Sequence, residues 1–215
     1  MNLNNFTFNT TSGIRFGSGM SVSSSQEICK ILGSNILFIT DKDLMSLKLT
    51  EPTLNELKKF SSKVEIFEDV EADPSLKTLL NSIEIGKKMK ATGVIGFGGG
   101  SSMDVAKLTS LILGSDENIE EVWGVSNAKG PRLPLVLVPT TAGTGSEVTP
   151  ISIITVGEEE KKGVSSPIIL PDVAILDPDL TIGLPAHTTA ATGIDAMVHA
   201  IEGYASANKN NNPIS

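Results

Sequence analysis

Short apolar runs alternate with stretches of helical period between residues 36 and 138. The runs at residues 36–40, 64–67, 93–97 and 133–138 have strand length and little polar interruption, so each predicts a buried strand. Between them, residues 44–49, 52–60, 75–89 and 102–113 repeat apolar positions at a spacing near 3.6 and predict helices. This alternation is typical of a parallel sheet with crossover helices.

The pattern changes after residue 138. Residues 151–156 and 163–166 flank a polar turn and predict a hairpin, and residues 173–176 predict one more short strand. No strand signal follows Asp177, and the small residues within 189–205 predict a closely packed helix. We therefore expect an α/β domain over residues 1–183 and the start of a helical domain over residues 184–215.

Composition excludes several classes of function. The formal net charge of -8 argues against a nucleic-acid partner, because phosphates would be repelled. No apolar run is long enough to span a membrane, and the start of the chain has neither a basic segment nor an apolar core of a secretory signal. Cys29 is the single cysteine, which fits a reducing compartment. These features predict a cytoplasmic protein that does not contact a membrane.

A glycine-rich turn follows the third predicted strand. Gly98, Gly99 and Gly100 allow close approach of the backbone to a ligand, and Ser101 and Ser102 open the next helix with hydroxyl donors. Amides at a helix N-terminus favour an anion, and ligands of open α/β sheets bind at the carboxyl ends of strands. The segment lacks the third glycine of the Rossmann fingerprint. Phosphate binding is therefore predicted, with a tight structural turn as the alternative.

A second loop, PTTAGTGSE, follows the fourth predicted strand. It carries the hydroxyl groups of Thr140, Thr141, Thr144 and Ser146 with almost no side-chain bulk. So many small hydroxyl residues at a strand end favour contacts with a ribose or a phosphate. The alternative is an ordinary connecting loop.

Asp41 comes directly after the first predicted strand. A carboxylate there can accept hydrogen bonds from an adenosine ribose, which favours NAD over NADP. Asp41 can equally be the N-cap of the helix that follows. Position alone does not separate the two roles.

Asp195 and His199 lie four residues apart in the last predicted helix, so their side chains share one face and can converge on one cation. An ordinary ion pair is the alternative. The flanking apolar residues Ile194 and Met197 predict that this helix is mostly buried. Oxygen and imidazole ligands suit Fe(II), Zn(II), Ni(II) or Mn(II). His187 is expected to be a capping or surface residue.

Four segments together resemble the iron-containing (group III) alcohol dehydrogenase family. They are GGGSSMDVAK, LPLVLVPTTAGTGSEVTP, LPDVAILDPDLTIGLP and AATGIDAMVHAIEGYAS, in the order and spacing of that family. The resemblance covers the chain from Phe6 to Ser215. It implies a Rossmann-like NAD-binding α/β domain followed by an all-helical domain, an architecture shared with dehydroquinate synthase.

The resemblance also implies roles for individual residues. NAD would be held at its adenosine ribose by Asp41, at its pyrophosphate by residues 98–102, and at its nicotinamide side by Thr140, Thr141, Thr144, Ser146 and Lys162. Asp195 and His199 match two ligands of a catalytic divalent metal, with Fe2+ expected first and Zn2+ second. The implied reaction is hydride transfer between NAD(H) and a small primary alcohol or aldehyde, with the metal polarising the substrate oxygen.

The resemblance further implies two more metal ligands, both histidines, and a substrate-side histidine, in helices that this sequence does not contain. We therefore expect this chain alone to bind metal poorly, to have little dehydrogenase activity and to associate through the uncovered apolar face of its last helix. The full-length protein is expected to be a homo-oligomer. Two alternatives remain: a non-catalytic nucleotide-binding or assembly module, and a zinc lyase similar to dehydroquinate synthase.

Overall fold

The computed structural model describes residues 9–158 and 160–205. The strands are β1 (Gly13–Phe16), β2 (Asn35–Ile39), β3 (Lys63–Phe67), β4 (Gly93–Gly98), β5 (Gly124–Val125), β6 (Leu135–Pro139), β7 (Ile151–Val156), β8 (Glu160–Ser165) and β9 (Val173–Leu176). The α-helices are α1 (Met20–Ser23), α2 (Ser25–Leu32), α3 (Lys42–Ser46), α4 (Glu51–Phe60), α5 (Leu76–Met89), α6 (Gly100–Ser115), α7 (Ile119–Val122) and α8 (Ala186–Ala205). Short 3-10 helices occupy Ser146–Val148, Pro167–Ile169 and Pro178–Thr181.

Six strands form one parallel sheet in the order β1-β9-β6-β4-β2-β3. The chain runs outward from β2 to β3 and then returns to the other side of β2 to form β4. The strand order therefore reverses between β2 and β4, which is the position where open α/β sheets bind ligands. A smaller sheet combines the antiparallel β7–β8 hairpin with β5.

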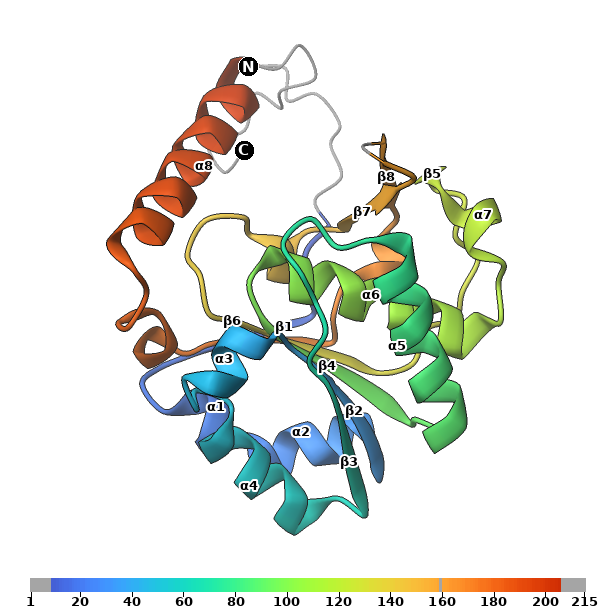
Figure 1. Cartoon of the computed structure of the whole chain (residues 1–215), viewed down its shortest axis with the longest axis vertical. Helices are drawn as coiled ribbons and strands as arrows, with labels where there is room; N and C mark the ends of the chain where they lie inside the picture. The colour runs from blue at the N-terminus through green and yellow to red at the C-terminus, as the bar shows by residue number, and fades with distance from the viewer. Residues whose placement is uncertain (1–8, 159, 206–215) are drawn as a thin grey trace, which may run out of the picture.

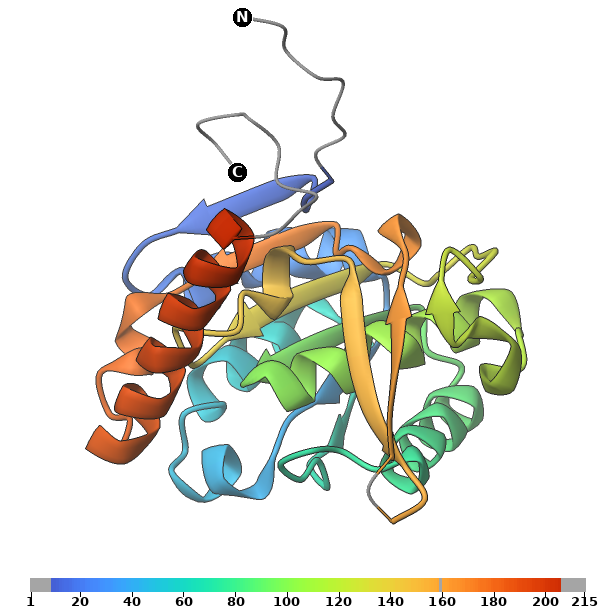
Figure 2. The same cartoon turned by 90° about the horizontal axis from the view of Figure 1, so that it is seen from above.

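The central strands β2, β4 and β6 are buried on both faces, which explains their uninterrupted apolar runs. Leu37 and Leu137 belong to the core cluster on the face covered by α5 and α6. Phe38 and Val138, their neighbours in sequence, belong to the cluster that includes residues of α2 and α4. Figures 1 and 2 show this arrangement of helices around the central sheet. The α/β architecture predicted from the sequence is confirmed.

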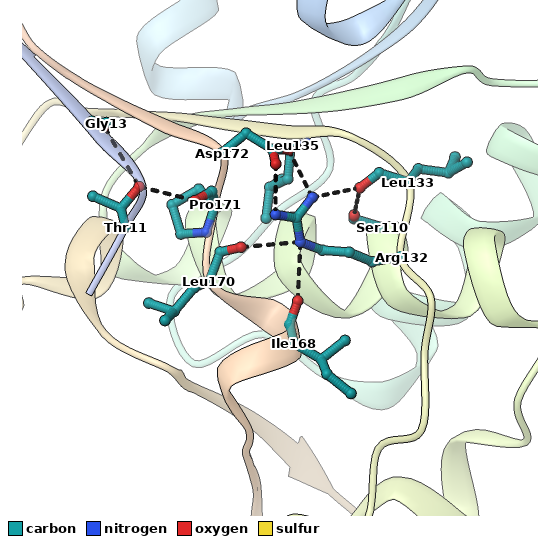
Figure 3. Close-up of polar contacts among 10 residues, drawn as sticks. All are labelled: Thr11, Gly13, Ser110, Arg132, Leu133, Leu135, Ile168, Leu170, Pro171 and Asp172. Atoms are coloured by element: carbon teal, nitrogen blue, oxygen red, sulfur yellow. Dashed lines mark hydrogen bonds and ion pairs between the residues drawn. The ribbon is translucent and has the colours of Figure 1, made fainter. Parts of the chain in front are cut away.

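A polar cluster ties the amino ends of β6 and β9 together (Figure 3). The Arg132 guanidinium donates to both carboxylate oxygens of Asp172, at 2.7 and 3.0 Å, and its Nε donates to the carbonyls of Ile168 and Leu170. Asp172 also accepts from the N–H of Leu135. Because the strands are parallel, this cluster lies at the end of the sheet opposite the glycine-rich turn, and its role is to hold the framework.

The helix α8 runs along one side of the molecule (Figure 1) and differs from the expectation of burial. None of its residues is buried, and Met197 and Tyr204 are 63% and 80% exposed. The prediction of a mostly buried helix is therefore wrong, since α8 presents its apolar residues to solvent. The domain boundary predicted after residue 183 stays a prediction. Across the part of the chain that the structure describes, no helix is long and apolar enough to cross a membrane.

Candidate cofactor and metal site

The carboxyl ends of β2, β4 and β6 lie side by side at the reversal of strand order. Ile39 is in register with Gly96, and Gly98 with Pro139. Asp41, the glycine-rich turn and the threonine loop therefore emerge from neighbouring strands at one edge of the sheet. The structure brings together the two loops that the sequence singled out separately.

The glycine-rich turn leads directly into α6 without a side-chain cap. The N–H groups of the first helical turn have no intrahelical acceptor and are suited to bind an anion. Gly98 has a φ of 153°, and a Cβ on it would lie 2.7 Å from Ser102 Oγ. A Cβ on Gly100 would lie 3.0 Å from Thr144 Cγ2. Glycine at position 98 is thus favoured by both its φ and its closeness to Ser102, while Gly100 leaves room for the tight contact with the threonine loop.

The threonine loop is hydrogen-bonded to the glycine-rich turn. The N–H of Thr140 donates to the carbonyl of Gly98 at 3.0 Å, and the Thr140 side chain is buried. Thr141 Oγ1 is buried and has no hydrogen-bond partner within the described residues. The N–H of Ser146 donates to Thr144 Oγ1. A buried hydroxyl without a partner at this position is consistent with a ligand that supplies one.

A cavity of about 660 Å³ opens where the two loops meet the hairpin and α8. Its wall includes predicted cofactor residues from both loops and both predicted metal ligands. The lining side chains and backbone come from Asp73, Pro74, Gly100, Ser101, Asp104, Thr144, Ser146, Thr149, Ile151, Ile153, Thr155, Lys161, Asp195 and His199. The cavity has the size of a small-molecule site.

Lys107 and Asp104 of α6 form a buried pair that the sequence did not reveal as a pair. The Lys107 ammonium donates to Ser146 Oγ at 2.8 Å, to the Thr149 carbonyl at 3.0 Å and to the Ile151 carbonyl at 2.7 Å. Asp104 accepts from the Ser146 hydroxyl, and its Oδ1 lies 3.8 Å from Lys107 Nζ. The three N–H donors of Lys107 thus hold the end of the threonine loop, at Ser146, and the segment that follows it.

Burial sets the protonation behaviour of this pair. Desolvation lowers the pKa of Lys107 to about 8, although the negative charge of Asp104 opposes that shift. Desolvation likewise raises the pKa of Asp104, against the opposing effect of Lys107 and of the hydrogen bonds from Ser146 and Ile153. A lysine in a helix ordinarily predicts a solvated surface residue. The available signal was that Lys107 is the only basic residue in the apolar stretch 103–113.

Asp41 is the N-cap of α3, since its Oδ1 accepts from the N–H of Leu44 at 2.9 Å. Burial raises the pKa of Asp41, and the negative charge of Asp43 adds to the rise, while the capping hydrogen bond opposes it. The capping role is therefore confirmed. The ribose-binding role stays a prediction, and the position of Asp41 after β2, beside the glycine-rich turn, is the position that role requires.

Asp195 and His199 point toward one another on α8, with 3.6 Å between Oδ1 and Nε2. Ligand distances near 2.0–2.2 Å allow one cation to contact two donors at this spacing. A carboxylate and an imidazole also fit iron or zinc chemically. Within residues 9–158 and 160–205, no group of three or more His, Cys, Asp or Glu side chains could hold a metal. His187 lies on the surface, as expected.

The side chains of the two hairpin lysines, Lys161 and Lys162, have different partners. Lys161 lines the cavity and forms an ion pair with Asp73. Lys162 is the lysine that the resemblance assigns to the cofactor, and its Nζ lies 3.8 Å from Oε2 of Glu120. The role of Lys162 stays a prediction, while Lys161 is the hairpin lysine that the cavity contains.

A reversed strand order with a glycine-rich turn, a hydroxyl-rich loop and a small-molecule cavity at the reversal defines a dinucleotide-binding α/β protein. The profile of the iron-containing alcohol dehydrogenase family matches residues 11–178. The chain belongs to this family, whose members use NAD(H) and iron.

Relatives and solved structures agree with this assignment. Sulfoacetaldehyde reductase of Bilophila wadsworthia is 34% identical over 200 residues, covering 93% of this chain and 52% of that protein. Long-chain-alcohol dehydrogenase 1 of Geobacillus thermodenitrificans is 38% identical over 185 residues, covering 85% and 47%. The crystal structure of a 1,3-propanediol oxidoreductase superposes with a TM-score of 0.91 at 33% identity, covering 98% of this chain and 55% of that one.

A sulfoacetaldehyde reductase from Bifidobacterium kashiwanohense, solved in complex with NAD+, has a TM-score of 0.84 at 32% identity and covers 94% and 54%. The chain spans about half the length of the curated relatives it matches.

Proposed function

We propose that this chain is the NAD-binding part, together with the first metal-binding helix, of a metal-dependent alcohol dehydrogenase or aldehyde reductase. The observation that carries the proposal is that one cavity is lined by Gly100 and Ser101, by Thr144 and Ser146, and by the Asp195–His199 pair. The division after residue 183 remains part of this proposal.

In this proposal the N–H groups at the start of α6 bind the pyrophosphate, and Asp41 binds the adenosine ribose through its carboxylate. The threonine loop orients the nicotinamide side, with the buried hydroxyl of Thr141 as one contact. Asp195 and His199 supply two donors to a divalent metal, which when bound polarises the oxygen of a small primary alcohol or aldehyde. A cytoplasmic location and a homo-oligomeric full-length protein complete the proposal, and the free Cys29 thiol supports the first.

The binding half of the proposal is tested by calorimetric titration of the chain with NAD+. Ser101→Asp places a negative charge in the first turn of α6, where it stabilises the helix but repels a pyrophosphate. Two like charges about 4 Å apart near a surface repel by roughly 4 kcal/mol, so NAD+ affinity should fall more than about tenfold. Ser101→Asn, of equal size and no charge, is the matched control. Equal affinities of the two variants would contradict pyrophosphate binding here.

The catalytic half is tested by NADH formation from small primary alcohols in the presence of Fe2+ or Zn2+. The chain alone should show little turnover, since two ligands leave the metal shell incomplete. Turnover typical of the family from the chain alone would contradict this expectation.

A second candidate is a non-catalytic nucleotide-binding module. It is favoured by the absence, from the described ranges 9–158 and 160–205, of a third metal-capable side chain near Asp195 and His199. NAD+ binding that is unchanged by metal would favour this candidate over the dehydrogenase.

A further inference from the structure

Gly143 of the threonine loop lies against the backbone of α8. A Cβ at this position would be 2.5 Å from the carbonyl oxygen of Thr192, 2.7 Å from its Cβ and 2.9 Å from its Cα. The backbone of Gly143 is not in the left-handed region, so a side chain is excluded by Thr192 alone and not by the conformation of the loop. The absence of a side chain is what lets the loop and the helix touch.

This contact is important because little else holds α8. No residue of the helix is buried, and Thr192 and Asp195 are among its few partly covered residues. Thr192 lies three residues before Asp195, slightly less than one helical turn, so the contact fixes the segment of α8 that carries the metal-ligand pair. The next residue of the loop, Thr144, lines the cavity that Asp195 and His199 also line.

We propose that Gly143 is a positioning residue that sets the distance between the cofactor loop and the Asp195–His199 pair, and thereby couples NAD binding to metal binding. This inference rests on the proposed function. Any side chain at position 143 has to displace α8 by most of an ångström before its contacts with Thr192 become ordinary ones. The loop and the pair would each remain intact, but they would no longer be aligned.

The test measures the affinity of the 215-residue chain for NAD+ with and without millimolar Mn2+, and for Mn2+ with and without NAD+. In the unmodified chain each ligand should tighten the other by at least about fivefold, the low end of ordinary site–site coupling, and by the same factor in both directions. Gly143→Ala should reduce this factor below about twofold, where the factor is the ratio of two affinities measured in the same variant. Gly193→Ala is the matched control: it is adjacent to Thr192 on α8, and its added Cβ meets no atom within 4 Å.

The outcomes separate the two proposals. Failure of the unmodified chain to bind NAD+ would overturn the proposed function and this inference with it. NAD+ binding without Mn2+ binding, binding of both ligands without coupling, or coupling that survives Gly143→Ala would each overturn the inference alone. Loss of coupling in Gly143→Ala and not in Gly193→Ala would support it.

Hydrogen–deuterium exchange on the unmodified chain gives a second measurement that needs no variant. NAD+ bound at the loop should slow exchange of the amides around Thr192. Unchanged exchange there, under conditions where NAD+ is bound, would contradict the contact's proposed role.

Discussion

Replacing Lys107 by methionine removes the cation that holds the end of the threonine loop and the segment after it, while keeping an unbranched apolar stem. Three hydrogen bonds are lost, to Ser146, Thr149 and Ile151. Hydrogen bonds from a charged donor contribute about 1.5–3 kcal/mol each. The burial cost of the ammonium offsets part of that sum, since lowering the pKa from 10.5 to about 8 corresponds to roughly 3 kcal/mol.

The net loss expected for Lys107→Met at neutral pH is therefore about 3 kcal/mol, in the range for removing one partner of a buried pair. For a chain of this length, that lowers Tm by roughly 6–12 °C. NAD+ affinity should fall as well, because the hydroxyls of the loop lose their support. Thermal unfolding followed by circular dichroism and a calorimetric NAD+ titration measure both effects. A Tm within about 2 °C of the unmodified chain would refute the reasoning.

The pH dependence supplies a second check on Lys107. Its folded-state pKa is depressed, so the unfolded chain binds more protons between pH 8 and pH 10.5. Above pH 10.5, Lys107 is neutral in both the folded and the unfolded chain, so its burial costs the folded state no charge. As the pH falls through about 8, the folded chain has to bury the charged ammonium and loses this stability. The amount by which the Tm of Lys107→Met lies below that of the unmodified chain should therefore grow as pH rises across this window. A deficit that shrinks there would mean that burial does not depress the Lys107 pKa.

Three other predictions concern separate parts of the molecule. Asp41→Ala should remove the α3 cap at a cost of about 1 kcal/mol and reduce the preference for NAD+ over NADP+, measured by thermal unfolding and by titration with both nucleotides. Burial alone would raise the pKa of Asp172, but the Arg132 hydrogen bonds and charge and the Leu135 N–H outweigh it and hold that pKa below 3.8. The stability that ionised Asp172 contributes is lost as pH falls through its lowered pKa. The Tm difference between the unmodified chain and Arg132→Met should therefore be smaller in acid than at neutral pH, and an equal difference at both would contradict this. Met197→Glu should reduce self-association by light scattering without lowering Tm, since Met197 is exposed on α8.

The central strands could be predicted because they are covered on both faces and so read as continuous apolar runs. β1 could not, since it is a four-residue edge strand whose residues alternate between partial burial and exposure. α2 was also missed: it is short, and its buried positions include Ser25 and Cys29, which carry little apolar signal. The periodicity of α8 predicted its helix correctly, but a pattern shows only that a face is apolar and not whether anything covers it.

The candidate site, too, could be predicted from the sequence only in part. Glycine, threonine and serine at strand ends predict a ligand-binding loop, because their small size lets the backbone approach a ligand closely. The hydrogen bonds from Lys107 that hold the loop could not be predicted from the sequence, because Lys107 resembles any helical lysine until its three acceptors are known. Gly143 is similar: its neighbour across the contact, Thr192, is 49 positions away in the printed sequence.

These supports explain why the loop can be built from residues with so little packing surface. The small side chains of Thr140, Thr144 and Ser146 bury too little area to fix the loop by themselves. The loop is instead held at three places: by the Thr140 N–H on Gly98, by Lys107 on Ser146, and by the contact of Gly143 with α8. The first two anchors lie within the α/β core. The third joins the loop to the segment of α8 that carries Asp195 and His199. In the proposed dehydrogenase this connection would affect the rate, because about 1 Å of misplacement can cost a hundredfold.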